Sequence, residues 1–232
     1  MKRRYGLIVA LDVIEPEQAI SIANQIKEYI DAIKVSIPSV VLPLARNKIN
    51  IISRLREVTG LPVIADWKVA DVPHMDSMIV DVLGKLGATA VIVHGFMGED
   101  AVSSCVKTAE SYCMETFVVV ELSSPGAVRV MQPLGEELAL LARGCGASGI
   151  IAPATRPERV QQYRKIVGEE MMILSPGVGA QGGIPGCAIR AGADFEIVGR
   201  SIVNSDNPAE QARRISLETQ RAINERTGAQ ET

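Results

Sequence analysis

The feature that most constrains the fold is a regular alternation of short apolar runs and helical segments along the chain. The first run, residues 7–12, is apolar until it ends in an acid, which is typical of a strand buried on both faces of a parallel sheet. Seven similar runs follow, separated by segments with helical periodicity, and this indicates repeated βαβ units. The strands that the pattern predicts are residues 7–12, 32–36, 63–68, 89–94, 116–122, 149–153, 171–175 and 194–198.

Eight strands in a chain of this length fit a closed (β/α)8 barrel, or TIM barrel, better than an open doubly wound sheet, so the predicted fold class is α/β. No linker or low-complexity tract interrupts residues 1–232, and a single domain is expected, with a flexible polar tail at about 227–232. The helices that we expect are residues 15–29, 40–58, 74–86, 99–112, 134–144, 157–166, 186–191 and 208–226.

The composition excludes several classes of function. A net charge of −3 provides no basic field for nucleic acid. The four cysteines have no C-x-x-C spacing and no nearby histidines, so we expect neither a zinc site nor a disulfide framework. No apolar run approaches the length of a membrane span, and Asp12 interrupts the run after the basic N-terminus, which argues against a signal peptide. A soluble, cytoplasmic protein is therefore expected.

Three ionisable residues follow directly on the third predicted strand. Asp66 and Lys68 lie two positions apart, so the alternation of side chains along a strand would project both from one face. Asp71 comes just after them, where the chain turns toward a helix. Charge at the end of a buried strand is costly unless it is paired or used in chemistry. A structural salt bridge is the alternative, since ion pairs also collect at strand ends.

Other unusual residues fall at the same end of their predicted strands, which is where (β/α)8 barrels carry their active sites. Independent structural salt bridges would not be expected to choose this rim every time, so we interpret the rim as a candidate site. Its members outside the third strand are Asp12, Lys34, His94, Ser123, Thr155, Arg156, Gln181 and Arg200.

A glycine-rich loop, residues 175–183, follows the seventh predicted strand, and Gly199 and Arg200 follow the eighth. Barrels frequently bind phosphate at this place, because glycines expose backbone N–H groups and a short helix offers its positive N-terminus. Arg200 would add a charge-assisted hydrogen bond. Turn chemistry alone is another explanation for such a loop. The loop and the adjacent arginine together predict a phosphate site.

The two histidines are weaker candidates. His94 ends the fourth predicted strand, where a role in capping the strand by hydrogen bonding competes with a role in catalysis. His74 lies outside the strands and is expected at the surface. Two histidines offer little material for a Ser/His/Asp triad.

The motifs at these strand ends make the chain resemble the orotidine 5'-phosphate decarboxylases, particularly the short archaeal forms. The D-x-K-x-x-D element at residues 66–71 also occurs in hexulose-phosphate synthases and ketogulonate-phosphate decarboxylases, whose second strand presents a metal-binding glutamate. Here that strand presents Lys34, which favours the orotidylate enzymes over the magnesium-dependent ones. The matching segments are Leu11–Asp12, Ile33–Val35, Ala65–Pro73, Val93–Gly95, Ser123–Ala127, Ala154–Arg159, Ser175–Gly183 and Ile197–Ser201.

The resemblance implies a carboxy-lyase that converts orotidine 5'-phosphate to uridine 5'-phosphate (UMP) and CO2, the last step of de novo UMP synthesis, with no cofactor and no metal. Loss of CO2 leaves a carbanion at C6 of the pyrimidine, so the site must hold positive charge there and supply a proton. Lys68 matches the family's proton donor, and Asp66 would lie by the substrate carboxylate. Lys34 completes a Lys-Asp-Lys-Asp array and touches the ribose, which Asp12 also contacts.

The same resemblance assigns Asp71 to the neighbouring subunit's site, which makes a homodimer the expected functional unit. Ser123 would contact the pyrimidine edge, and Arg156, beside Thr155, would support the loop that carries Gln181. That loop is expected to close over the ligand. The substrate-binding residues that follow are Asp12, Lys34, Ser123, Pro176, Gln181, Gly199 and Arg200.

Two positions depart from the family's pattern. Many relatives have a threonine where this chain has Met75, so the contact across the dimer rests on Asp71 alone. Archaeal forms often have a histidine where this chain has Ser124, which leaves open whether Ser123 or Ser124 faces the base.

Two alternatives to a metal-independent decarboxylase remain. The first is a magnesium-dependent sugar-phosphate aldolase or decarboxylase of the same superfamily, which a dependence on metal would reveal. The second is a non-catalytic sensor of a phosphate ligand built on the same barrel. A sensor would keep its function when Lys68 is replaced by alanine.

Overall fold

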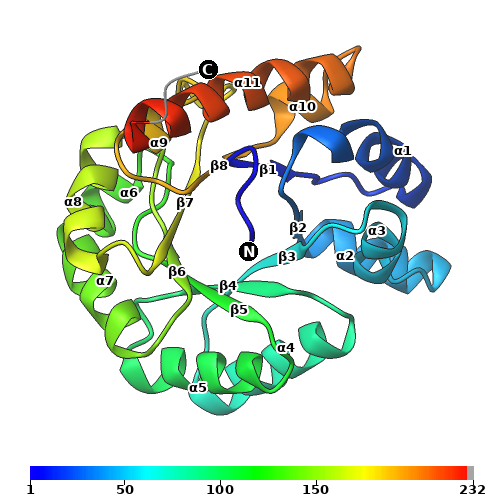
Figure 1. Cartoon of the computed structure of the whole chain (residues 1–232). Helices are drawn as coiled ribbons and strands as arrows, with labels where there is room; N and C mark the ends of the chain where they lie inside the picture. The colour runs from blue at the N-terminus through cyan, green and yellow to red at the C-terminus, as the bar shows by residue number, and fades with distance from the viewer. Residues whose placement is uncertain (229–232) are drawn as a thin grey trace.

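The computed structural model describes residues 1–228 and contains one closed barrel of eight parallel strands, viewed along its axis in Figure 1. Each strand pairs with the next one in the chain, and β8 closes the ring by pairing with β1. The predicted (β/α)8 barrel is confirmed. The strands are β1 (Leu7–Ala10), β2 (Ala32–Ser36), β3 (Val63–Val69), β4 (Ala90–His94), β5 (Glu115–Val119), β6 (Gly149–Ile151), β7 (Met172–Pro176) and β8 (Phe195–Val198).

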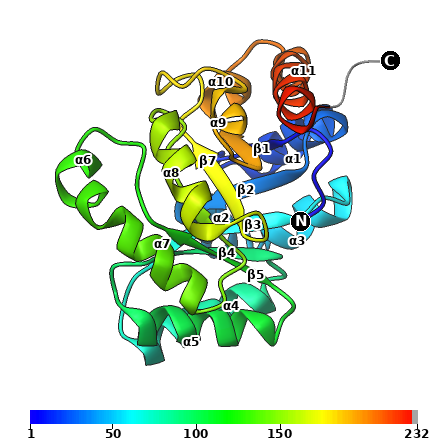
Figure 2. The same ribbon diagram turned by 60° about the vertical axis from the view of Figure 1, so that its left-hand side comes forward.

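Helices alternate with the strands and cover the outside of the barrel (Figures 1 and 2). Among the described residues, none of these helices combines the length and the apolar character needed to cross a membrane. They are α1 (Pro16–Ile26), η1 (Lys27–Tyr29), α2 (Ile37–Asn47), α3 (Ile51–Thr59), α4 (Pro73–Lys85), α5 (Glu99–Glu110), α6 (Ala127–Val130), η2 (Gln132–Leu134), α7 (Gly135–Gly144), α8 (Pro157–Val167), α9 (Cys187–Arg190), α10 (Arg200–Val203) and α11 (Pro208–Thr227).

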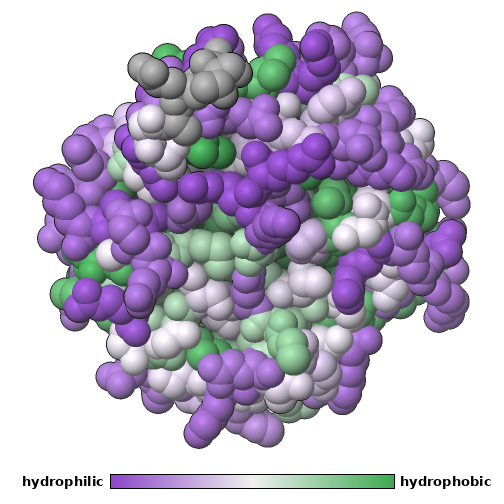
Figure 3. Space-filling view, viewed as in Figure 1, coloured by the Kyte–Doolittle hydropathy of each residue, from purple (hydrophilic) through white to green (hydrophobic). Residues whose placement is uncertain are grey.

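The core consists of two layers because successive side chains of a strand point to opposite faces. In β1, Leu7 and Val9 pack with residues of the surrounding helices, such as Ile22, whereas Ile8 packs with Phe117 and other strand residues inside the barrel. Both faces of each strand are therefore buried, which explains why the strands are continuous apolar runs. Hydrophilic side chains remain outside, as the largely purple rim in Figure 3 shows.

The helix predicted over residues 40–58 is in fact two helices, α2 and α3, so this prediction was wrong. Lys48 adopts a left-handed conformation, with φ of 58°, and ends α2. The side chain of Asn50 then accepts a hydrogen bond from the backbone N–H of Ser53 and begins α3. An asparagine is a preferred N-cap residue, so the break had a sequence signal.

The prediction also missed three short helical segments, α6, η2 and α10. Segments of three or four residues are too short to produce a helical period in the sequence. In Figure 2, α6 stands at the outer edge of the molecule. The predicted tail at 227–232 is described only at its beginning: Thr227 ends α11, Gly228 follows it, and residues 229–232 lie outside the described part of the chain.

Candidate active site

A cavity of about 560 Å³ opens at the carboxyl ends of the strands. This is the end of a (β/α)8 barrel at which active sites form. Nine of the twelve predicted site residues line it, and Asp71, Thr155 and Arg156 do not. The nine are Asp12, Lys34, Asp66, Lys68, Ser123, Pro176, Gln181, Gly199 and Arg200.

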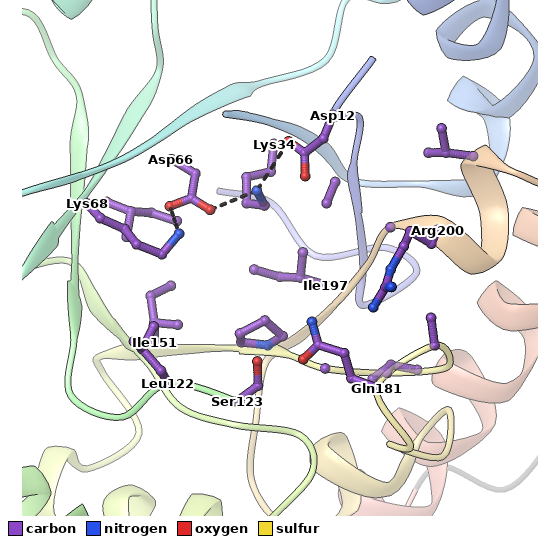
Figure 4. Close-up of a pocket in the computed structure, with 18 of the residues that line it drawn as sticks. Asp12, Lys34, Asp66, Lys68, Leu122, Ser123, Ile151, Gln181, Ile197 and Arg200 are labelled. Carbon is purple, nitrogen blue, oxygen red and sulfur yellow. Dashed lines mark hydrogen bonds and ion pairs between the residues drawn. The ribbon is translucent and has the colours of Figure 1, made fainter. Parts of the chain in front are cut away.

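One wall of the cavity carries a row of alternating charges. Lys34 Nζ lies 2.8 Å from Asp66 Oδ2 and 3.8 Å from Asp12 Oδ1. Lys68 Nζ lies 2.7 Å from the other oxygen, Asp66 Oδ1. Figure 4 shows these four side chains together, with Arg200 across the cavity from them. The row therefore runs Asp12, Lys34, Asp66, Lys68, and Asp66 at its centre is shared by two cations.

The electrostatics of this row keep Asp66 ionised. Burial by itself would raise the pKa of Asp66, but the charges of Lys34 and Lys68 outweigh burial and hold the pKa below its usual value. The carboxylate is only 9% exposed, whereas the side chain of Lys68 is 42% exposed. Lys68 can therefore exchange protons with solvent while Asp66 keeps its charge.

An irregularity in β3 brings Asp66 and Lys68 to the same place. Ala65 pairs with Val91 and Val69 pairs with Val93, so four steps along β3 correspond to two steps along β4. Lys68 lies inside this bulge with φ of 45°, a left-handed conformation that costs a residue with a side chain about 1–3 kcal/mol. Simple strand alternation, from which we predicted a shared face, is thus not the geometry that joins the two residues.

The wall opposite the charge row contains the glycine-rich loop after β7. Gly179 has φ of 76°, and a side chain on it would collide with the hydroxyl of Ser201. The Ser201 hydroxyl also accepts a hydrogen bond from the backbone N–H of Ala180 at 3.0 Å, which ties the loop to α10. Gln181 and Arg200 are both exposed and both line the cavity. Two strand ends thus place an amide and a guanidinium together.

The residues after β5 and β6 form a further side of the cavity. Ser123 lines it, whereas Ser124 is exposed and is not among the lining residues in the described part of the chain. A side chain on Gly177 would meet Ser123 Cβ and Thr155 Cγ2, each at 3.1 Å. Thr155 therefore packs directly behind the cavity wall, although it does not line the cavity itself.

Arg156 makes different contacts from those predicted. Its Nε donates a hydrogen bond to Glu121 at 2.7 Å, and its Nη2 donates to the carbonyl of Leu122. These hydrogen bonds reach the segment after β5, and among the described residues none joins Arg156 to the loop with Gln181. Glu121 was missed by the sequence reasoning, although it comes directly after an apolar run in the sequence, as Asp66 does.

Asp71 lies outside the cavity of its own chain and is exposed. Its backbone N–H donates a hydrogen bond to Asp76 Oδ1 at 2.8 Å. Asp76, which the sequence reasoning also missed, is fully buried, and its other oxygen has no hydrogen-bond partner among the described residues. Burial raises the pKa of Asp76. This buried acid fixes the turn that presents Asp71.

Neither histidine lines the cavity in the described part of the chain. His74 is exposed. His94 stands next to the charge row but not in the cavity lining, and its ring lies 4.6 Å from that of Phe96. Burial, with the nearby charge of Lys68, lowers the pKa of His94 to about 4. His94 is therefore neutral at pH 7.

Comparison of the sequence with known proteins points to one family. The sequence model of the "Orotidine 5'-phosphate decarboxylase / HUMPS family" matches residues 6–215. The orotidine 5'-phosphate decarboxylase of Methanococcoides burtonii is 50% identical over 215 residues, which cover 93% of this chain and 97% of that protein. The enzyme of Thermococcus kodakarensis is 46% identical over 209 residues, which cover 90% of this chain and 94% of that protein.

Solved structures are similar over the same extent. The crystal structure of orotidine 5'-monophosphate decarboxylase from Methanocaldococcus jannaschii, complexed with inhibitor BMP, has a TM-score of 0.85 and 37% identity, and the match covers 92% of this chain and 97% of that one. The orotidine 5'-phosphate decarboxylase of Pyrococcus horikoshii has a TM-score of 0.83 and 42% identity, with 92% and 99% covered. The chain therefore belongs to the orotidine 5'-phosphate decarboxylase / HUMPS family.

Proposed function

We propose that this protein decarboxylates orotidine 5'-phosphate to UMP and CO2. The observation that carries the proposal is the alternating row of Asp12, Lys34, Asp66 and Lys68, which lines a cavity whose far wall holds Arg200. The anionic phosphate of a nucleotide suits Arg200, and the charge row suits the ribose and the reacting carboxylate. The activity named for the similar proteins supports the same reaction.

Lys68 is the proposed proton donor. When the bond to CO2 breaks, its two electrons remain on C6, and a proton from Lys68 Nζ forms the new C–H bond. Lys68 Nζ is held 2.7 Å from Asp66, which stabilises the ammonium before transfer. Its 42% exposed side chain allows solvent to restore the proton afterwards.

Asp66 is proposed to act on the substrate carboxylate through repulsion. The lowered pKa keeps Asp66 negative, so a carboxylate bound beside it is destabilised, and the repulsion falls as neutral CO2 forms. Lys34, which bonds the other oxygen of Asp66, is proposed to contact the ribose together with Asp12. The two carboxylates and the two ammonium groups thus have separate tasks.

Lys34 also argues for a reaction without metal. A magnesium site needs oxygen ligands around the ion, and relatives that use magnesium present a glutamate from this strand. Here an ammonium group stands between Asp12 and Asp66, where it repels a divalent cation and occupies the carboxylates that would bind it. We therefore expect turnover to persist after complete removal of metal.

The phosphate is proposed to bind at the ends of β7 and β8. Arg200 and Gln181 supply side-chain donors, and the backbone at Gly199 and in the loop that starts at Pro176 supplies N–H groups. Both named side chains are exposed, which leaves them free to close on a ligand. Closure would use phosphate binding to order the rest of the site.

We also propose a homodimer in which Asp71 contributes to the partner's site. Asp71 is exposed at the start of α4. Met75, Met78 and Val82 are exposed apolar residues three and four positions apart, so they share one face of that helix. An exposed apolar face beside Asp71 suits a second copy of the chain.

Mixing two inactive variants tests the shared site. A Lys68→Ala chain and an Asp71→Ala chain, recombined after denaturation or co-expressed, should regain about one quarter of wild-type activity, because half of the dimers are mixed and each of these has one intact site. Unmixed samples of each variant are the controls. Failure of activity to return in verified mixed dimers would contradict the shared site.

The direct test of function is an assay of the purified protein with orotidine 5'-phosphate in excess EDTA. We expect loss of the ultraviolet absorbance of the substrate and release of one CO2 per UMP formed. Activity that depends entirely on added magnesium would favour the sugar-phosphate enzymes of the superfamily. Tight binding of UMP without any turnover would favour a sensor of phosphate ligands.

A further inference from the structure

Glu121 is a fully buried acid beside the cavity that the proposed reaction does not use. It follows β5, its side chain is 0% exposed, and it is not among the residues that line the cavity. An ionised carboxylate has about four lone-pair sites for hydrogen bonds. Burial without partners would be very costly, so the partners of Glu121 decide what it does.

Four donors fill the sites of this carboxylate. Oε1 accepts hydrogen bonds from Arg156 Nε at 2.7 Å and from Gln132 Nε2 at 3.3 Å. Oε2 accepts from the Tyr163 hydroxyl at 2.6 Å and from Arg159 Nε at 3.1 Å. Burial, together with the hydrogen bond to Glu121, raises the pKa of Tyr163, so this residue remains a donor.

These donors come from separate parts of the chain. Gln132 belongs to η2, whereas Arg159 and Tyr163 belong to α8 and Arg156 immediately precedes it. Arg159 Nη2 also donates to the carbonyl of Gln132 at 3.2 Å. Glu121 therefore fastens the segment after β5, the start of α8 and the helical segment η2 to one another.

Besides the peptide bond from Glu121 to Leu122, hydrogen bonds of Arg156 connect the cluster to the cavity. Arg156 uses Nε for Glu121 and Nη2 for the carbonyl of Leu122, so the carboxylate fixes the guanidinium that fixes Leu122. Leu122 and the next residue, Ser123, both line the cavity. Figure 4 shows Leu122 far from Arg200, and Ser123 between Leu122 and Gln181. Glu121, which does not line the cavity, is thus linked through one guanidinium to a residue that does.

We propose that Glu121 is a positioning residue that holds the base-binding wall, Leu122 and Ser123, in place through Arg156. This inference rests on the proposed function, in which Ser123 contacts the pyrimidine. It assigns Glu121 no contact with substrate. Its effect should therefore be confined to ligands that carry a base.

Glu121→Gln is the informative substitution because it keeps the volume and removes only the charge. The amide nitrogen of glutamine is a donor, so whichever way the amide faces, it meets the donors of one arginine instead of accepting from them. A displacement of the wall by a fraction of an ångström to 1 Å is enough to cost up to about a hundredfold in rate. We expect kcat/KM for orotidine 5'-phosphate to fall by roughly tenfold to a hundredfold.

The measurement that separates positioning from general folding is a pair of dissociation constants. We expect Glu121→Gln to weaken UMP binding about tenfold and to leave ribose 5-phosphate binding unchanged, because the second ligand has the phosphate and ribose but no base. Equal weakening of both ligands, or no change in either, would overturn the proposal. A wild-type protein that does not convert orotidine 5'-phosphate would instead remove the proposed function, and the inference with it.

Asp194 provides a matched control. It is also an acid held by arginines, with Arg164 Nη2 at 2.5 Å and Arg226 Nη2 at 3.5 Å, but it precedes β8 at the opposite end of the barrel. Asp194→Asn should lower the melting temperature and leave both dissociation constants unchanged. If Asp194→Asn reproduced the selective loss of UMP affinity, the effect of Glu121→Gln would be a general consequence of reduced stability, and the proposal would be wrong.

Discussion

Asp66 and Glu121 are two carboxylates in similar settings that serve different purposes. Asp66 lies within β3 and Glu121 follows β5, and each is held by two cationic side chains. The cations of Asp66 are lysines, whose ammonium groups are compact and can give up a proton, whereas those of Glu121 are arginines, which stay charged and have a fixed geometry. Under the two proposals, charge that takes part in the reaction is paired with lysine, and charge that holds a position is paired with arginine.

Exposure separates Lys68 from the other three cations, because the side chain of Lys34 is only 8% exposed and is as buried as the arginines. Lys68 is 42% exposed and faces the cavity, while the side chains of Arg156 and Arg159 are 15% and 13% exposed. A buried pair loses about 3–5 kcal/mol when one partner is removed, because the other charge is left uncompensated. Removing an arginine from the Glu121 cluster should therefore cost more stability than removing Lys68, whose loss should mainly lower the rate.

The largest effect should come from Lys68→Ala. Removal of the proton donor is expected to lower kcat by about 10⁴-fold, the upper end of what general acid catalysis contributes, while the melting temperature changes little. Steady-state kinetics and thermal unfolding measure the two quantities. Lys85→Ala, which removes a lysine paired with Asp81 on the surface of α4, should leave both unchanged. A large loss of stability in Lys68→Ala would contradict the expectation that Lys68 contributes to rate rather than to stability.

A smaller loss of activity, about 10²-fold to 10³-fold in kcat/KM, is expected for Asp66→Asn, because the amide neither repels the substrate carboxylate nor pairs two ammonium groups.

The stability of the protein should also depend on pH through Asp66. The pKa of Asp66 is lowered in the folded protein from the ordinary value of 3.8, so the unfolded chain takes up the proton at higher pH. The contribution of Asp66 is present above about pH 4 and is lost as pH falls through the lower, folded value.

Denaturant unfolding at a series of pH values tests the predicted loss of stability at low pH. Wild-type protein should lose stability on acidification below about pH 4 more steeply than Asp66→Asn, which has no carboxyl group to titrate at this position. Equal slopes in the two proteins would show that Lys34 and Lys68 do not hold Asp66 in its charged form.

We expect the smallest effect on kcat from a substitution of His94, which lies next to the charge row but does not line the cavity. With a pKa of about 4 it is neutral at pH 7 and its Nδ1 has no partner among the described residues, so His94→Phe should change kcat by less than about tenfold. Unfolded histidine takes up a proton near pH 6.5, before the folded one does. His94 therefore contributes stability above pH 6.5 that is lost between pH 6.5 and 4, and His94→Phe should flatten this slope. A rate loss above a hundredfold would include His94 in the chemistry.

The barrel was predictable because each strand is buried on both faces and therefore reads as an apolar run. The charged residues of the cavity lining were predictable because charge at the end of such a run is costly, whereas uncharged ones such as Pro176 and Gly199 came from the glycine-rich loop and the family resemblance. Asp66, Lys34 and Arg200 all carry such a charge. Glu121 carries it as well, but its partners lie in η2 and around α8, and a sequence does not reveal which buried acid meets a cavity and which meets arginines. The hydrogen bonds of Arg156 to Glu121 and Leu122 were not predicted for the same reason.

The break between α2 and α3 and the bulge in β3 show a second limit. In both, a lysine adopts the left-handed conformation, Lys48 and Lys68, which its residue type does not predict; only the first break had another signal, the N-cap residue Asn50. Alternation along a strand predicted the right neighbours, Asp66 and Lys68, from an incorrect local geometry. Residue types indicate which side chains meet more reliably than they indicate the backbone that brings them together.

The bulge in β3 also limits how the site can be rebuilt elsewhere. Deleting one residue from it would turn every later side chain of the strand to the opposite face, and Lys68 would leave the cavity. Deleting two would restore even pairing with β4 but shorten the distance along the chain between the acid and the ammonium. A designer who transplants this reaction to another barrel must therefore copy the backbone of β3 and β4 as a unit, because grafting the aspartate and the lysine onto a regular strand would reproduce the sequence motif without its geometry.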